Sequence, residues 1–402
     1  MSLSTRGAAP QKTKIKSSGV VSGRKIRVTS TTGYARTDLP RLDDDYAWER
    51  DRALTKMTPD GLKPLTKQEQ HDEHKMTKAL LKKYTANILT CDYGAFSFPI
   101  AYSEPRSYLE RTSELFAFLV NMYIPKAMET DDPVMKLVYI TSGIVAGYHL
   151  DLNQKKVFNP MLGETYVGKW ENGASIYAEQ TSHHPPLSCF QLYGPDNSWY
   201  CYSDEIKFSV DNGLSQLDVA MKGVFHLQLK DGPLYEWEFP TVQLSGQVKG
   251  PRIVKIKGSI EVNDVTNNLV AGIEVNPKIK KRDCQSSTIF GGIKKVDKNK
   301  LKISLKEDYL KTFNGDYAQK VEINDNEVIW DIKRDIVHRA IGEVKDDELI
   351  PSDVRFRLDR NLLIEKNMEE ADKAKTALEE VQRREEKIRV CVKKKTSNIK
   401  LK

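Results

Sequence analysis

Apolar residues recur every four positions in the first strongly patterned stretch of the chain, HKMTKALLKKYTANIL. At this spacing Met76, Leu80, Tyr84 and Ile88 lie on one side of a helix. The stretch therefore predicts an amphipathic helix over about residues 75–92.

Further helices are expected over about residues 105–150. The stretch SEPRSYLERTSELFAFLVNMY combines a Ser/Glu/Pro start signal with helical apolar spacing. The stretch DDPVMKLVYITSGIVAGYHL repeats this arrangement, with Pro133 in its first turn, where the missing N–H costs no hydrogen bond.

From about residue 159 the apolar period changes to two, in segments such as QLDVAMKGVFHLQLK, RIVKIKGSIEV and EVIWDIK. Turn residues such as DGP and NDNE separate these segments, as they separate antiparallel strands. So many strands without helices between them favour a barrel or a strongly curled sheet over about residues 159–335. The region of about 350–390 is charged and helical in pattern.

Basic residues gather at the two ends of the chain. Residues 1–36 hold eight Lys or Arg and residues 387–402 hold seven, with no acidic residue in either. Removing these fifteen from the 63 basic residues leaves 48 against 56 acidic ones, so the body is acidic. Basic tails suit solvated termini, an anionic membrane surface or nucleic acid, but an acidic body argues against a nucleic-acid binder. Residues 1–70, rich in Ser, Thr and Gly, predict a mostly disordered leader, and residues 391–402 a basic tail.

Hydrophobic stretches and cysteines indicate the part of the cell in which the protein is expected. The longest nearly uncharged stretches fall short of the roughly 20 apolar residues that cross a bilayer, so we expect no integral membrane protein. The five cysteines are scattered and have no CxxC spacing, which favours a reduced cytoplasmic compartment.

The stretch EQTSHHPPLS places His183 and His184 directly before two prolines. Because proline cannot donate to a strand ladder, the pair is expected at a strand end, where both imidazoles can lean towards one anionic group. The alternative is one buried, hydrogen-bonded histidine and one exposed histidine. No Cys, Asp or Glu stands at a familiar ligand spacing from the pair, so we expect no metal site.

Two other groups of residues are candidates for binding. Lys155 and Lys156 precede an Asn-Pro turn, and a lysine aimed by a rigid turn suits a phosphate, although surface lysines in a loop explain the pattern too. Lys375, Glu379 and Arg383 stand four apart and share one helix face, as do many solvated ion pairs.

Five stretches together resemble the oxysterol-binding protein-related family of lipid-transfer proteins. EQTSHHPP is similar to the family's E-Q-V-S-H-H-P-P signature, with Thr181 in place of Val. FSFPIAYSEPRSYLER, KVFNPMLGETYVGKW, YEWEFPTVQLSG and KTALEEVQR resemble further family segments in the same order, over roughly residues 72–390. Val157 departs from the pattern, because the family has Pro after the lysine.

This resemblance implies an α+β, mainly β fold. We expect a near-complete antiparallel β-barrel that encloses a hydrophobic lipid tunnel, with an N-terminal lid and flanking helices. The lipid-binding domain would span residues 71–390, and Leu80, Tyr84 and Ile88 would belong to the lid.

The resemblance also implies a ligand and its site. Members extract phosphatidylinositol 4-phosphate and exchange it for a sterol or, in some branches, phosphatidylserine between membranes. The positions that match the family's headgroup site are Lys156, Asn159, His183, His184, Lys375, Glu379 and Arg383.

We therefore expect a cytoplasmic lipid-transfer protein that binds membranes peripherally and transiently, with no cofactor and no catalytic residue. Its partners would be membrane lipids and the membrane surface, not nucleic acid; protein partners, the second lipid and the membranes served stay open. The alternative is a phosphoinositide or sterol sensor that acts through a protein partner. A phosphatase that uses a histidine is disfavoured, because no nucleophile stands at a recognisable spacing from His183 or His184.

Overall fold

A computed structural model of the chain describes most of the region after residue 98. The described residues are 57–58, 60–62, 66–68, 71–72, 74–75, 78, 99–152, 155–212, 216–230, 232–246, 252–277, 286–296, 308–324, 326–335, 341–342 and 349–397. The predicted lid residues Leu80, Tyr84 and Ile88 lie outside the described residues, so the lid stays a prediction.

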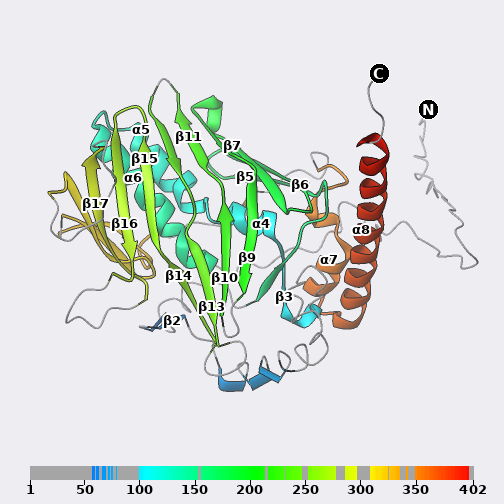
Figure 1. The fold of residues 1–402 in the computed structure, drawn as a ribbon. Coiled ribbons are helices and arrows are strands. Elements are labelled where there is room, and N and C mark those ends of the chain that lie inside the picture. Colours follow the sequence, from blue (N-terminus) through cyan, green and yellow to red (C-terminus); the bar gives the residue numbers. More distant parts are fainter. Residues whose placement is uncertain are drawn as a thin grey trace, which may run out of the picture.

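An antiparallel sheet dominates the fold, as the period-two pattern predicted (Figure 1). Its nineteen described strands are β1 (Met57–Thr58), β2 (Gly61–Leu62), β5 (Thr165–Trp170), β6 (Ser175–Ser182), β7 (Leu187–Tyr193), β8 (Trp199–Ser203), β9 (Ile206–Asn212), β10 (Gln216–Lys222), β11 (Phe225–Leu229), β12 (Leu234–Trp237), β13 (Thr241–Ser245), β14 (Ile253–Lys257), β15 (Ser259–Asp264), β16 (Leu269–Val275), β17 (Thr288–Lys295), β18 (Lys311–Asp316), β19 (Lys320–Ile323), β20 (Glu327–Asp331) and β21 (Ile341–Gly342).

Four long strands in the middle of the sheet are each interrupted once. The halves are β8 and β9, β10 and β11, β12 and β13, and β14 and β15, and each half pairs with the matching half of its neighbour. Gly223 and Gly258 lie at two of the interruptions with φ of 144° and 103°, a backbone region that other residues rarely adopt. The interruptions therefore form a line across the sheet.

The expected barrel is only partly supported. Strand pairing runs without a break from β15 through β16, β17, β18 and β19 to β20, and β5 pairs with β21 at the other end. Among the described residues no pairing joins β20 to β5 or β21, so hydrogen bonds do not close this sheet. The antiparallel sheet is confirmed, whereas closure into a barrel stays a prediction.

The helices expected over residues 105–150 lie behind the sheet in Figure 1. They pack against it through α4 and α6, which contact strands near both ends of the sheet. Their bounds are α4 (Tyr108–Glu114), the π-helical turn η4 (Leu119–Tyr123), α5 (Ile124–Met128), α6 (Pro133–Ala146) and the short helix η5 (Gly147–Asp151).

Of the two predicted helix starts, the second is correct and the first is wrong. Asp132 caps α6 through Val134 N–H, and Pro133 follows it as predicted. In contrast, the Ser/Glu/Pro segment forms β3 (Ser103–Ser107), which pairs in parallel with β4 (Lys156–Phe158). The cap of α4 is Ser107, whose capping box with Glu110 satisfies backbone N–H groups at the helix start.

Aromatic side chains join the helices to the sheet in the core. Phe116 lies 5.3 Å from Phe225, measured between ring centroids, and Phe225 lies 5.7 Å from Trp237 and 5.2 Å from Phe239. All four side chains are buried. This cluster anchors the segment after α4 to the interrupted strands.

Residues 57–62 correct the predicted extent of the disordered leader. Strands β1 and β2 pair with each other, and Leu62 of β2 pairs with Val254 of β14. The Leu62 side chain is only 1% exposed, and Met57 is buried with it. Two short segments of the predicted leader, Met57–Thr58 and Gly61–Leu62, are therefore part of the folded sheet, because Met57 and Leu62 pack into the core.

The C-terminal region contains the expected helices, α7 (Leu358–Ile364) and α8 (Met368–Ser397), after the short helix η8 (Val354–Phe356). The start of α8 packs through Ala371 against Ile100 and Phe158, and the Ile100 N–H donates to Asp372 Oδ1 at 2.9 Å. Figure 1 shows the rest of α8 beside the end of β6. None of the described helices has the length and apolarity needed to cross a membrane.

Candidate functional site

Three segments that lie far apart in the sequence come together in the structure. They are β4 with the turn that follows it, the turn between β6 and β7, and one face of α8 itself. Each carries part of the predicted headgroup site. The structure therefore brings together residues separated by up to about 230 positions.

The histidine pair lies in the β6–β7 turn, as the two prolines predicted. Gln180 supports this turn, because its amide donates to Ser182 O at 2.6 Å and accepts a hydrogen bond from Ser188 Oγ. The His183 and His184 rings lie 4.6 Å apart at 74°. His183 is half-buried, the side chain of His184 is 52% exposed, and both rings contact α8. The two rings are thus unequally exposed, but neither is fully buried, as the alternative interpretation expected of one of them.

Helix α8 gives the two histidines different partners. Gln382 Nε2 lies 2.7 Å from His183 Nδ1, and Glu386 Oε2 lies 3.5 Å from His184 Nε2. Burial, together with the charges of His184 and Arg389 and against that of Glu386, lowers the pKa of His183 to about 4. His183 is thus a neutral hydrogen-bonding group at physiological pH.

Lys156 lies beside the same helix, because its charge interacts with those of Lys375 and Glu379. Its ammonium group donates to Asn159 Oδ1 at 2.7 Å and to Val157 O at 3.3 Å. Burial lowers the pKa of Lys156 to about 8, and the positive charges of Lys375 and Arg357 act in the same direction. Lys155 is exposed, whereas the charge of Lys156 interacts with those of Lys375 and Glu379 on α8.

The predicted residues of α8 share one face, as their spacing required. The Lys375 ammonium donates to Glu379, whose other carboxylate oxygen accepts from Arg383 Nη2 at 3.2 Å. Lys375 is only 8% exposed, whereas half of the Arg383 side chain reaches solvent. Glu379 therefore bridges a buried and an exposed cation beside Lys156.

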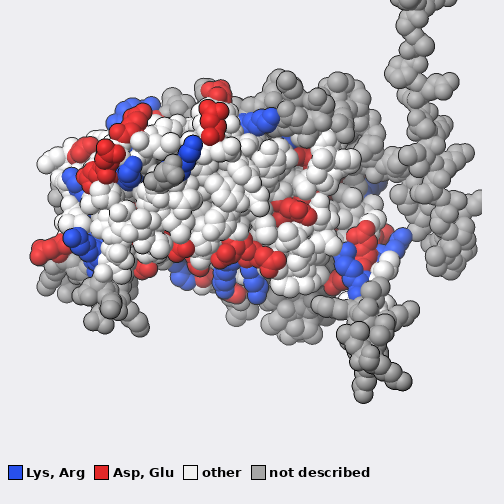
Figure 2. Space-filling model, turned by 90° about the horizontal axis from the view of Figure 1, so that it is seen from above, with Lys and Arg blue, Asp and Glu red and all other residues white. Residues whose placement is uncertain are grey.

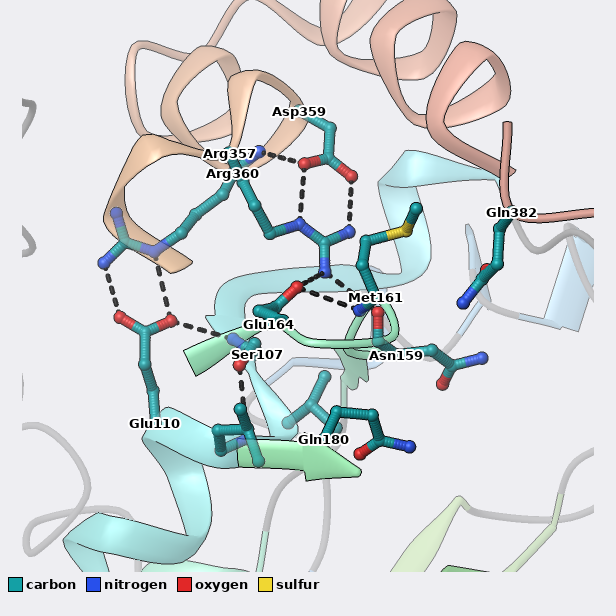
Figure 3. Close-up of polar contacts among 12 residues, drawn as sticks. Ser107, Glu110, Asn159, Met161, Glu164, Gln180, Arg357, Asp359, Arg360 and Gln382 are labelled. Carbon is teal, nitrogen blue, oxygen red and sulfur yellow. Dashed lines mark hydrogen bonds and ion pairs between the residues drawn. The ribbon is translucent and has the colours of Figure 1, made fainter. Parts of the chain in front are cut away.

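A buried ionic network fixes the turn that carries Asn159 (Figure 3). Arg357 donates to Asn159 O at 2.9 Å and to Glu164 Oε2 at 2.8 Å, and two further nitrogen atoms of its guanidinium bind Asp359. The same guanidinium lies 4.9 Å from the Phe158 ring centroid. Glu164 also accepts from Met161 N–H, so Arg357 clamps the whole turn from residue 158 to 164.

A second pair extends this network to α4. Arg360 donates to both carboxylate oxygens of Glu110, at 2.6 and 3.1 Å, and Glu110 also accepts from Ser107 N–H, as Figure 3 shows. Burial alone would raise the pKa of Glu110, but the Arg360 charge and hydrogen bonds lower it. The network thus joins α4, the turn after β4 and α7 into one support beneath the site.

Comparison with known proteins gives the arrangement a family. Residues 80–401 match the family model described as oxysterol-binding protein. The chain belongs to the oxysterol-binding protein family. Oxysterol-binding protein 9 of Dictyostelium discoideum is 31% identical over 72% of this chain and 69% of its own length, and oxysterol-binding protein 10 of the same organism is 28% identical over 78% of each.

Solved structures show the same fold. The Osh3 ORD from Saccharomyces cerevisiae, in complex with PI(4)P, matches with a TM-score of 0.63 at 22% identity and covers 76% of this chain and 84% of its own. The Osh1 ORD domain in complex with ergosterol matches with a TM-score of 0.61 at 20% identity, over 77% of this chain and 78% of its own. Membership of the oxysterol-binding protein family makes this chain a lipid-binding protein, not an enzyme.

Sequence reasoning missed two members of the α8 face. Gln382 stands seven residues after Lys375, and Glu386 stands seven after Glu379. Seven residues are close to two helical turns, so this spacing alone would have placed both on the predicted face. Arg357 and Glu164 were missed as well, but they are 193 positions apart and no local pattern links them.

Two open cavities are lined by described residues, and both have polar walls. One, of about 500 Å³, lies between α5, α6 and β20 and includes Lys126 and Arg334. The other, of about 460 Å³, lies along the strand interruptions and includes Lys257 and Glu261. Neither is an enclosed apolar tunnel, so the tunnel stays a prediction. On the face seen in Figure 2, basic and acidic side chains are intermixed around a broad uncharged area.

Proposed function

We propose that this member of the oxysterol-binding protein family extracts phosphatidylinositol 4-phosphate and exchanges it for a sterol or phosphatidylserine between membranes. The observation that carries the proposal is that Lys156 and His183 both lie along the face of α8 that carries Lys375, Glu379 and Arg383. The complexes of the Osh3 ORD with PI(4)P and of the Osh1 ORD with ergosterol or cholesterol support it.

The headgroup would be bound by charge-assisted hydrogen bonds. Removing a phosphate from water without partners would be prohibitive, and ammonium and guanidinium groups provide the strongest donors for it. Lys156, Lys375 and Arg383 would supply these donors, and His183 and His184 would add imidazole N–H groups. Asn159 would orient Lys156 through the contact that it already makes. Glu379 would hold Lys375 and Arg383 in place.

The acyl chains require a separate solution. At about 0.8 kcal/mol for each buried CH₂, exposing two chains of ordinary length to water would cost on the order of 20 kcal/mol or more. We propose that the sheet closes into a near-complete barrel around an apolar tunnel, and that the helix over about residues 75–92 is its lid. Replacing Leu80 with Asp should impair retention of the extracted lipid; equal retention by Leu80→Asp and the wild type would exclude this lid.

The proposed setting is cytoplasmic, with transient and peripheral binding to membranes. The basic residues of 1–36 and 387–402 would add weak attraction to anionic leaflets, at about 1 kcal/mol for each Lys or Arg near the surface. Such attraction falls within a Debye length, so it should weaken strongly as salt is raised.

A vesicle exchange assay tests the transfer function. Donor vesicles carry phosphatidylinositol 4-phosphate, acceptor vesicles carry sterol or phosphatidylserine, and the protein is present at about one molecule for every hundred transferable lipids. Transfer of many lipids by each protein, in opposite directions, is the expected result. Extraction of one lipid for each protein without turnover would instead favour the sensor that acts through a protein partner.

A further inference from the structure

Glu386 is a second acidic residue, after Glu379, on the face of α8 that carries the proposed anion site. Its carboxylate lies 3.5 Å from His184 Nε2 and is 41% exposed. It follows Lys375, Glu379 and Gln382 along the same face of α8, with spacings of four, three and four residues.

The contacts along α8 direct this carboxylate towards the histidine turn. Arg383, three residues before Glu386, pairs with Glu379, and Arg389, three residues after it, contacts Glu385 at 3.8 Å. Glu386 itself contacts His184 across 202 positions of sequence and also acts on the charge of His183. Its partner is therefore in the β6–β7 turn.

We propose that Glu386 limits the site to headgroups with one phosphate monoester. This inference rests on the proposed phosphoinositide function. Lys156, Lys375 and Arg383 supply three positive charges, of which Glu379 already balances one. A single phosphate monoester brings a charge of about −1.5 to −2, in addition to the phosphodiester charge that every phosphoinositide carries, so one monoester already uses the remaining cations. A second phosphate adds a similar charge, and Glu386 repels it on the His184 side of the site.

A purely structural role for Glu386 makes a different prediction. If the carboxylate only holds His184 in place, its loss would weaken the binding of every phosphoinositide by a similar factor. If it excludes additional negative charge, its loss would alter the preference between lipids, because the repulsion grows with the number of phosphates. The ratio of two affinities therefore separates the two roles.

The test compares the wild type with Glu386→Gln, which keeps the size of the side chain and removes its charge. Extraction is measured from neutral liposomes that contain either phosphatidylinositol 4-phosphate or phosphatidylinositol 4,5-bisphosphate. We expect the ratio of bisphosphate to monophosphate extraction to rise about five- to tenfold, and the rise to shrink at high salt. Glu369→Gln is the matched control, since Glu369 is exposed at the start of α8 and pairs with Lys373, and it should leave the ratio unchanged.

Each outcome has a separate meaning. If Glu386→Gln changes the extraction of both lipids by the same factor, or changes neither, the proposed role of Glu386 is wrong. Extraction of the monophosphate by the wild type would still support the proposed function. Failure of the folded wild type to extract the monophosphate would overturn both. Equal thermal midpoints of the three proteins would show that the comparison is made between folded chains.

Discussion

Gln382 Nε2 lies 2.7 Å from His183 Nδ1, and this contact determines which nitrogen of His183 carries its proton. An amide nitrogen only donates, so Nδ1 accepts and the proton of the neutral ring is on Nε2. A doubly protonated ring would place two donors against each other. Burial and the charge of His184 lower the pKa of His183, and the Gln382 contact suits the neutral ring that results.

Removing this donor should raise the pKa of His183. In the wild type we expect a titration midpoint near the value of about 4, and Gln382→Ala should move it towards the ordinary value for histidine. Gln382→Glu should raise it further, because a carboxylate accepts a hydrogen bond from a protonated ring. The measurement is the pH dependence of the His183 ring signals by NMR. An unchanged midpoint in both variants would show that Gln382 does not influence the proton.

Binding of a phosphorylated headgroup should take up protons near pH 8.5. Because the pKa of Lys156 is lowered to about 8, most of its amino groups are neutral at that pH before binding. A bound phosphate favours the charged form and raises the pKa, so a proton enters from the buffer. Calorimetry in two buffers of different ionisation enthalpy measures the uptake.

The control for this prediction is Lys156→Arg, which stays protonated at all these pH values. It should remove most of the uptake at pH 8.5. Near pH 6.5 the Lys156 contribution should vanish in the wild type as well, because the amine is then charged before binding. If the wild type and Lys156→Arg take up equal numbers of protons at pH 8.5, the proton binds to a group other than Lys156.

Arg357→Met should destabilise the protein and weaken the site together. The change leaves the buried carboxylates of Glu164 and Asp359 without their cation, which typically costs about 3–5 kcal/mol of unfolding free energy. It also releases Asn159 O and thus the turn that aims Lys156. Denaturant unfolding measures the first effect and headgroup binding the second.

Lys373→Met is a matched control for this loss of charge. Lys373 is exposed on α8, and its ion pairs among the described residues are with Glu369 and Glu370 of the same helix. We expect no measurable change in stability from it. A similar stability of Arg357→Met and the wild type would mean that the clamp on the turn contributes little.

Much of the fold was predictable from local patterns. Alternation predicted the strands because one face of the sheet is buried, and Asp132 with Pro133 marked the start of α6 correctly. The strand at Ser103–Ser107 was missed, because Pro105 in that segment resembles a helix start and its partner β4 is about 50 residues away. Closure of the sheet depends on contacts between strands distant in sequence, which no local pattern reveals.

The candidate site was predicted from helix spacing together with resemblance to a family. Composition alone left His183 and His184 open to a structural explanation, and it left Lys375, Glu379 and Arg383 as a solvated helix face. Only the folded chain shows that these groups face one another, and that Gln382 and Glu386 lie among them. The ionic support at Arg357 is formed between distant segments and was invisible to sequence reasoning.

Extraction of labelled phosphatidylinositol 4-phosphate from liposomes tests the central claim most directly. The wild type is compared with His183→Ala/His184→Ala, and His226→Gln serves as a control for a histidine on β11 that contacts Asp204 and Glu236. We predict about one lipid extracted for each wild-type or control protein, and at least a tenfold loss in the double variant at matched folding. No extraction by the folded wild type, or equal extraction by the double variant, would contradict the account.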